Sequence, residues 1–298
     1  MKKILALMLT LCLLAVSVVA CGPKDEPDTE SKYTLAIVID NAVSGVKISN
    51  TVCAVIADAD GKIVSVRFDA SDAEFSYDDE LVVPTNIESK VENYPEMNGK
   101  NWEGHANAFA DYVVGMTAEQ VKAVDLTLVT GCTMPYTTPL LKSLVVEALE
   151  SDRKVEFTSS VKPTLGVGMT TSAAGELGAS AEVVTVDAGA VAVVNGAIVA
   201  SVLDTAVREG TFTYEDEELV FTSAEYAGSK AEKGENYKMD AGSWYKQAAG
   251  FCSQTIGLTK DTIKDLAVTG DAMTAAGCTM QWTVYGYKTV LTKALNKA

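Results

Sequence analysis

The 298-residue sequence contains a single histidine, His105, and this scarcity excludes a metal site built from several histidines. Two common phosphate-binding motifs are also missing, since no Gly-x-Gly-x-x-Gly follows a strand pattern and no Gly-Lys-Ser/Thr occurs. The nearest glycine patterns, Gly166-Val-Gly168 and Gly175-Glu-Leu-Gly178, are interpreted as turns. We expect His105 on the exposed side of a helix.

Positive charge is scarce as well. Lysine and arginine number 24 against 40 aspartate and glutamate residues, a net charge of −16. Such a chain repels phosphates, which excludes nucleic acid and anionic lipid head groups as partners. The sequence also shows no nucleophile beside a base and no carboxylate pair of convincing spacing, which argues against a hydrolase.

The apolar run at residues 4–16 is shorter than the roughly 20 residues that a membrane-spanning helix needs. Lys2 and Lys3 precede it, and Val18-Val19-Ala20-Cys21 follows it. This order resembles a bacterial lipoprotein signal. The resemblance implies a signal peptide at 1–20, a lipid on Cys21 and a location on the extracytoplasmic face of the cell membrane. An ordinary secretory signal with a chance cysteine is the alternative.

Residues 21–32 are rich in Pro, Asp, Glu and Lys and predict a flexible tether, because such a composition cannot bury a core. Removal of the signal takes away two lysines and no other charge, leaving 278 residues with a net charge of −18. That length gives room for two domains of ordinary size, each with its own core.

One pattern occurs twice, and both copies reach the same four residues: Gly131-Cys132-Thr133-Met134 and Gly277-Cys278-Thr279-Met280. A repeat of this length indicates a domain duplicated in tandem rather than a solenoid unit. The mature chain therefore divides into a first repeat at 33–150, a linker at 151–163 and a second repeat at 164–298.

Both repeats predict the same order of elements. Asp60-Gly61 and Asn195-Gly196 lie between β-branched segments and favour tight hairpin turns. Strands are expected at 33–46, 52–57, 62–69, 165–172, 182–194 and 197–206. Helices are expected at 102–114, 136–149, 244–256 and 284–295, with short ones after Thr117 and Thr259. Because strands precede helices, the fold class is α+β: two tandem copies of a small antiparallel sheet packed with helices.

Four cysteines remain once Cys12 leaves with the signal and Cys21 is acylated. They are Cys53, Cys132, Cys252 and Cys278. Two disulfides could form with three connectivities, and the sequence does not choose among them. We expect Cys53 and Cys252 to be buried as small hydrophobic residues. For Cys132 and Cys278, a thiol role and a need for a small side chain beside glycine stay open.

The segment Thr130-Gly131-Cys132-Thr133, followed by a helix, resembles the Ser-Gly-Ala-Thr motif of FMN-binding domains. These domains occur in extracytoplasmic flavoproteins and in subunits of the sodium-pumping NADH:quinone oxidoreductase. The resemblance implies that a flavin transferase esterifies Thr133 and Thr279 to the FMN phosphate, while Gly131, Cys132, Gly277 and Cys278 shape the two turns. A helix N-terminus with free N–H groups would suit that phosphate.

The sequence departs from the family pattern at two positions. The acidic residue usually found six positions before the threonine is replaced by Thr127 and Met273. The serine position holds Thr130 in the first copy and Ala276 in the second. Since only the first copy keeps a hydroxyl there, Thr133 is predicted to be the better attachment site.

The segment from Tyr94 to Val121 also resembles a widespread group of lipoproteins from anaerobic bacteria. Its aromatic residues Tyr94, Trp102 and Tyr112 could stack on a flavin ring or pack in the core. Two functions follow. One is a membrane-tethered flavin carrier that exchanges electrons with a redox partner at the cell surface. The other is a non-catalytic surface lipoprotein, a scaffold that binds a small ligand or a protein partner.

Overall fold

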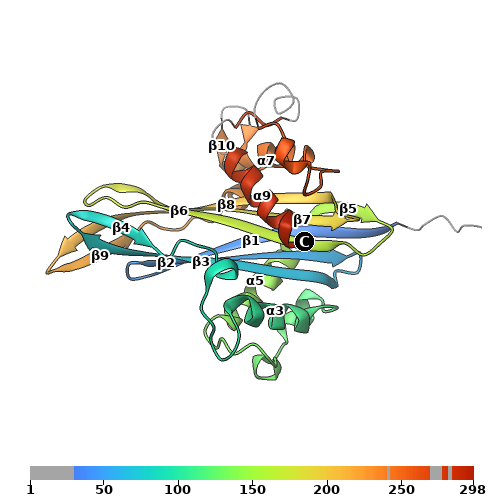
Figure 1. The fold of residues 1–298 in the computed structure, drawn as a ribbon, viewed down its shortest axis with the longest axis horizontal. Coiled ribbons are helices and arrows are strands. Elements are labelled where there is room, and N and C mark those ends of the chain that lie inside the picture. Colours follow the sequence, from blue (N-terminus) through green and yellow to red (C-terminus); the bar gives the residue numbers. More distant parts are fainter. Residues whose placement is uncertain (1–29, 240–241, 269–276, 281–283) are drawn as a thin grey trace, which may run out of the picture.

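The computed structural model describes residues 30–239, 242–268, 277–280 and 284–298. Two antiparallel sheets pack face to face, and helices cover the outer face of each sheet (Figure 1). The α+β fold class is therefore confirmed. The predicted signal peptide and Cys21 lie outside the described residues.

The first sheet has the strand order β4-β3-β2-β1-β5, and the second has the order β6-β7-β8-β9. The strands of the first sheet are β1 (Ser31–Ser44), β2 (Lys47–Asp58), β3 (Ile63–Asp78), β4 (Leu81–Thr85) and β5 (Val155–Ser159). Those of the second are β6 (Thr164–Ala173), β7 (Ser180–Val194), β8 (Ala197–Glu215) and β9 (Glu218–Ser223). A separate ribbon pairs β10 (Lys238–Met239) with β11 (Gly242–Ser243).

The helices lie between and after these strands. In the first repeat they are α2 (Lys90–Asn93), α3 (Trp102–Val113), α4 (Ala118–Lys122), η1 (Leu126–Leu128) and α5 (Thr138–Glu150). In the second they are α6 (Lys230–Lys233), η2 (Gly234–Asn236), α7 (Trp244–Ser253), η3 (Ile263–Asp265) and α9 (Val284–Lys297). No helix among the described residues is long and apolar enough to cross a membrane.

The predicted start of the short second helix is right in one repeat and wrong in the other. Thr117 begins α4 with a capping box completed by Gln120. The second repeat forms only the 3₁₀ turn η3 at the corresponding place. There the hydroxyl of Thr262 accepts the N–H of Thr259 at 2.8 Å, as Gln120 accepts the N–H of Thr117, but the Thr262 N–H bonds the Thr259 carbonyl and the capping box is incomplete.

Both faces of the central strands are buried, which explains their continuous apolar runs. In β2, the side chains of Val52, Ala54 and Ile56 belong to the core between the two sheets. The alternate residues Cys53 and Val55 belong to the core under the helices of the first repeat. Successive side chains of a strand point to opposite faces, so each strand contributes to two cores.

The core between the sheets is shared by both repeats. It joins Leu35 and Ile37 of β1 to Val167 of β6 and Val186 of β7 in one buried cluster. Each repeat also has a private core under its own helices. The expectation that each repeat has its own core is therefore incomplete, because one face of each sheet is buried only by the other repeat.

The predicted linker and the last two residues of the predicted tether contribute to strands of the first sheet. Residues 151–163 contain β5, which pairs with the start of β1 and stacks Phe157 on Tyr33 with ring centroids 5.5 Å apart. Ser31 and Lys32, predicted to belong to the tether, already belong to β1. The linker is thus the edge strand of the first sheet, added by the chain just before it enters the second repeat.

Gly166 and Gly168 lie within β6, so their interpretation as a turn is wrong. A Cβ atom on Gly166 would come within 1.9 Å of the Ala294 carbonyl oxygen, and one on Gly168 within 2.2 Å of the Val290 carbonyl oxygen. The absence of side chains lets the backbone of α9 rest directly on the sheet. Gly178, with φ at 75°, does lie in a turn.

Gly168→Ala should lower the free energy of unfolding by about 1–3 kcal/mol, because the methyl group must push α9 away from β6. Urea denaturation followed by circular dichroism measures this loss. Ser172→Ala, at an exposed position of the same strand, is the control and should change stability by less than about 0.5 kcal/mol. Equal stability of the two variants would contradict the close approach of α9.

Candidate functional site

The first of the two predicted attachment turns joins η1 to α5. Gly131 has φ at 85°, a conformation that favours glycine, and it turns the chain so that the Thr133 side chain is exposed. Met134 is buried beside it and anchors the turn in the core of the first repeat. The Met134 carbonyl accepts hydrogen bonds from the Thr138 N–H at 2.9 Å and from the Thr138 hydroxyl at 2.6 Å. These bonds start α5.

His105 lies beneath this turn, and its expected place on the exposed side of a helix is wrong. Only 1% of the residue is exposed. Its Nε2 is 2.8 Å from the Met97 carbonyl oxygen and must donate a proton to it. In the neutral ring, Nδ1 then accepts the Thr133 N–H at 3.3 Å. A doubly protonated ring would instead direct Nδ1–H to the Gly131 carbonyl, 3.2 Å away.

A tight hairpin turn at Asn98-Gly99 brings the ammonium group of Lys100 to the Gly131 turn. Asn98 and Gly99 both have positive φ, and backbone hydrogen bonds join Met97 to Lys100 in both directions. The Asn98 side chain donates to the Thr133 hydroxyl at 3.3 Å, and Lys100 Nζ donates to the Gly131 carbonyl at 3.2 Å. The sequence analysis did not identify these residues, although Asn-Gly is itself a recognised turn signal.

The second predicted turn is held differently. Both the N–H and the hydroxyl of Thr279 donate to Gln247 Oε1 at 2.9 Å. Gln247 is buried and lies three residues after Trp244, as His105 lies three residues after Trp102. The residue that corresponds to Lys100 is Gly242, since each follows the turn of the equivalent hairpin. The second turn therefore has no cation at this position.

The remaining predicted site residues lie around the two threonines. Thr130 is exposed, and its hydroxyl forms no hydrogen bond with any described residue. Gly277 has φ at 80°, close to the 85° of Gly131. Cys132 Sγ lies 3.1 Å from the Thr138 hydroxyl at the start of α5. Cys278 is buried in the core under the helices of the second repeat.

Trp102, Trp244 and Cys278, whose roles were left open, are buried. The four cysteines of the described chain are free, and Cys53 and Cys252 are buried as expected. Burial raises the pKa of Cys252 to about 12 and also raises the pKa of Cys278, which disfavours their reactive thiolates. Trp102 and Trp244 are 2% and 1% exposed and belong to the helix-covered cores. They cannot stack on a ligand.

An anion at Thr133 would depend on Lys100 more than on the helix. The N–H groups of Thr133, Thr137 and Thr138 are already used by His105 or by the Met134 carbonyl. The expected set of free N–H groups is therefore largely occupied. What remains is the exposed Thr133 hydroxyl on the turn whose Gly131 carbonyl binds the Lys100 ammonium, together with Tyr136, which is 95% exposed and three residues further along. This combination fits a phosphate group followed by a flat ring.

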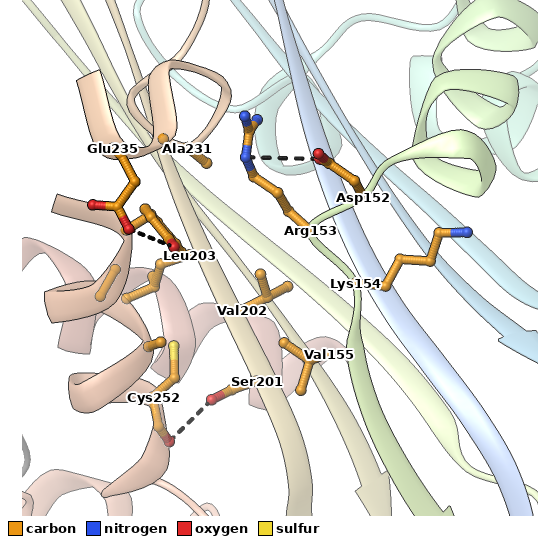
Figure 2. Close-up of a pocket in the computed structure, with 14 residues that line it drawn as sticks. Asp152, Arg153, Lys154, Val155, Ser201, Val202, Leu203, Ala231, Glu235 and Cys252 are labelled. Atoms are coloured by element: carbon orange, nitrogen blue, oxygen red, sulfur yellow. Dashed lines mark hydrogen bonds and ion pairs between the residues drawn. The ribbon is translucent and has the colours of Figure 1, made fainter. Parts of the chain in front are cut away.

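A second candidate site lies between the repeats, where the chain leaves α5. Two adjoining cavities have volumes of about 490 and 570 Å³ and are lined in common by Asp152, Arg153, Val202, Leu203 and Ala231. In Figure 2, Arg153 extends from the segment after α5, and Glu235 lies across from it on the second repeat. We call these two cavities the inter-repeat cleft.

The larger cavity of the inter-repeat cleft is lined by five carboxyl groups, those of Glu147, Glu150, Asp152, Asp204 and Glu232. Burial raises the pKa of Asp204 to about 7 although three hydrogen bonds support its charged form. Burial and the adjacent Glu232 raise the pKa of Glu147 to about 7, with Asp40 and Asp204 adding to the effect. The cleft thus holds carboxyl groups that lack compensating positive charge.

Comparison of the chain with protein-family models, with curated proteins and with solved structures finds no match.

The raised pKa values predict that stability falls with rising pH. In the unfolded chain these carboxyls titrate near their ordinary values of 3.8 and 4.5, so between about pH 4 and pH 7 the folded protein binds more protons. Glu147→Gln should therefore leave the melting temperature unchanged at pH 4.5 and raise it at pH 8. Glu156→Gln, on the exposed face of β5, removes the same charge outside the cleft and is the control. An equal effect of both variants at pH 8 would contradict the raised pKa.

Proposed function

We propose that the protein is an extracytoplasmic, lipid-anchored flavin carrier with FMN attached to Thr133. The observation that carries the proposal is the exposed Thr133 hydroxyl on a turn whose Gly131 carbonyl accepts a hydrogen bond from the Lys100 ammonium. A phosphoester on Thr133 would place its negative charge next to this cation. His105 and Asn98 fix the turn so that the hydroxyl faces solvent.

The two repeats support one flavin better than two. The second turn has Gly242 in place of Lys100 and Gln247 in place of His105, and Gln247 accepts a hydrogen bond from the Thr279 hydroxyl itself. Attachment to Thr279 would break that bond without gaining a cation. Thr133 is therefore the preferred site and Thr279 a weaker one.

FMN supplies reversible electron transfer when it is bound, and the protein supplies position and charge. An exposed attachment site suits both a flavin transferase that adds the group and a redox partner that exchanges electrons with it. Tyr136 offers an exposed ring on which an isoalloxazine could stack. A lipid on Cys21 would keep the carrier at the membrane, where such partners act.

The scaffold function remains the second candidate, and the inter-repeat cleft favours it. Cavities of 300–1,000 Å³ with apolar walls and a few polar groups are typical of small-molecule sites. Both cavities of the cleft fall in this range, and Thr133 lines neither of them. A ligand-binding surface lipoprotein would use the cleft and leave both threonines unmodified.

Co-expression with an active flavin transferase tests the proposal. The peptide that contains Thr133 should gain the mass of FMN less one water, and Thr133→Ala should abolish this adduct while the circular dichroism spectrum stays the same. Lys100→Gln should lower the adduct yield, because the phosphate loses its cation. Lys162→Gln removes the same charge at an exposed position outside this turn and is the matched control for Lys100→Gln. An unmodified Thr133 peptide in protein that also fails to bind free FMN would support the scaffold instead.

A further inference from the structure

The two repeats contain similar buried carboxylate arrangements, although Asp204 also accepts the Ala231 N–H at 3.0 Å. Asp69 accepts a hydrogen bond from the Ser89 hydroxyl at 2.6 Å, and Asp204 accepts one from the Ser229 hydroxyl, also at 2.6 Å. Each aspartate also accepts the N–H of the residue that follows it. Both aspartates are at most 2% exposed. A second carboxylate follows each serine by three residues, Glu92 in one repeat and Glu232 in the other.

In the first repeat this arrangement binds an ammonium group that comes from the other repeat. Lys297, near the end of α9, places Nζ 3.1 Å from Asp69 Oδ2 and 3.6 Å from Glu92 Oε1. Lys293, one turn earlier, places Nζ 3.4 Å from Glu92. The chain itself thus shows which ligand the Asp-Ser-Glu arrangement accepts, a primary ammonium on an alkyl chain.

In the second repeat the ammonium groups are missing. When α5 is matched to α9 through Met134 and Met280, the residues in place of Lys293 and Lys297 are Glu147 and Ser151. Glu147 adds a third carboxyl group to Asp204 and Glu232. All four residues line the larger cavity of the inter-repeat cleft. The place that Lys297 fills beside Asp69 is therefore a cavity beside Asp204.

Nearby cations do not compensate these carboxylates. Arg153 uses its guanidinium on the backbone carbonyl of Glu232 and on Asp152, 3.9 Å away. Lys230 lies near Asp187, Glu182 and Asp204, but in the part of the chain that the structure describes it forms an ion pair with none of them. Within the described chain, no lysine or arginine forms an ion pair with Asp204, Glu147 or Glu232.

We propose that the inter-repeat cleft binds a small primary alkylammonium compound, with its ammonium between Asp204, Glu147 and Glu232. The apolar walls formed by Ile37, Val146 and Leu203 would hold the alkyl chain, as the stem of a lysine packs along apolar surface. A metal ion is a poorer fit, because the described residues contain no group of three or more metal-ligating side chains with suitable geometry. The proposal is independent of the flavin at Thr133.

Titration of the mature protein with pentylammonium chloride tests the proposal by calorimetry and by NMR. We expect saturable binding to one site, and no binding of pentanol, which has the same chain without the charge. Potassium chloride at equal ionic strength should not compete. Glu147→Gln should weaken pentylammonium binding by about tenfold, the loss typical of one charge-assisted hydrogen bond.

A lysine at position 151, which corresponds to Lys297 of α9, should occupy the cavity and prevent ligand binding. Ser151→Lys should abolish pentylammonium binding and raise the melting temperature, because the new side chain can reach Asp204 as Lys297 reaches Asp69. Ser151→Met adds a side chain of similar length without the charge, and Ser160→Lys adds the charge at an exposed position after β5. Ser160→Lys should bind pentylammonium like the unaltered protein, whereas Ser151→Met should bind it more weakly than the unaltered protein and more tightly than Ser151→Lys.

Three results would overturn the proposal. They are the absence of saturable pentylammonium binding, equal binding by Ser151→Lys and Ser151→Met, and binding of calcium in preference to the amine. Circular dichroism of each variant confirms that the fold is retained. Since FMN attachment at Thr133 is read by mass, its failure is distinguishable from failure of amine binding.

Discussion

The packing of the two sheets against each other is the constraint on which the rest of the structure depends. Leu35 and Ile56 of the first sheet and Leu165 and Ala188 of the second become almost fully buried in one shared core. Phe75 packs at a tilt against its repeat counterpart Phe212, with ring centroids 4.7 Å apart. Because each repeat would expose this apolar face alone, we expect the two repeats to fold as one cooperative unit.

A buried polar chain crosses the same interface and fixes how the sheets are aligned. Arg208 of β8 donates to the Asn41 side chain at 2.7 Å, and Asn41 donates to Asn50 at 2.8 Å. Further along, Ser71 and Thr171 share a hydrogen bond of 2.6 Å between the sheets. An apolar interface alone tolerates sliding, whereas these bonds are satisfied in one alignment only.

The sequence predicts the repeat, the hairpins and most helix boundaries, because each depends on local signals such as Asn195-Gly196 and the Thr117 cap. It does not predict that the repeats share a core, since the run in β2 is apolar on both faces and periodicity cannot say what covers each face. His105 shows the same limit. From the sequence alone, a lone polar residue on a helix is predicted to be exposed. The prediction fails because the sequence does not show that the Met97 carbonyl and the Thr133 N–H lie within hydrogen-bond distance of the His105 ring. Duplication has left these features unequal: Lys100 stays in one turn, and the ammonium-filled carboxylate site stays in one repeat.

The most direct test of the account uses the fragments 30–160 and 161–298, prepared separately and then mixed. The shared core predicts that neither fragment alone shows a cooperative thermal transition or sharp near-ultraviolet circular dichroism, and that mixing restores both. A cooperative transition in either isolated fragment, unchanged by its partner, would contradict it.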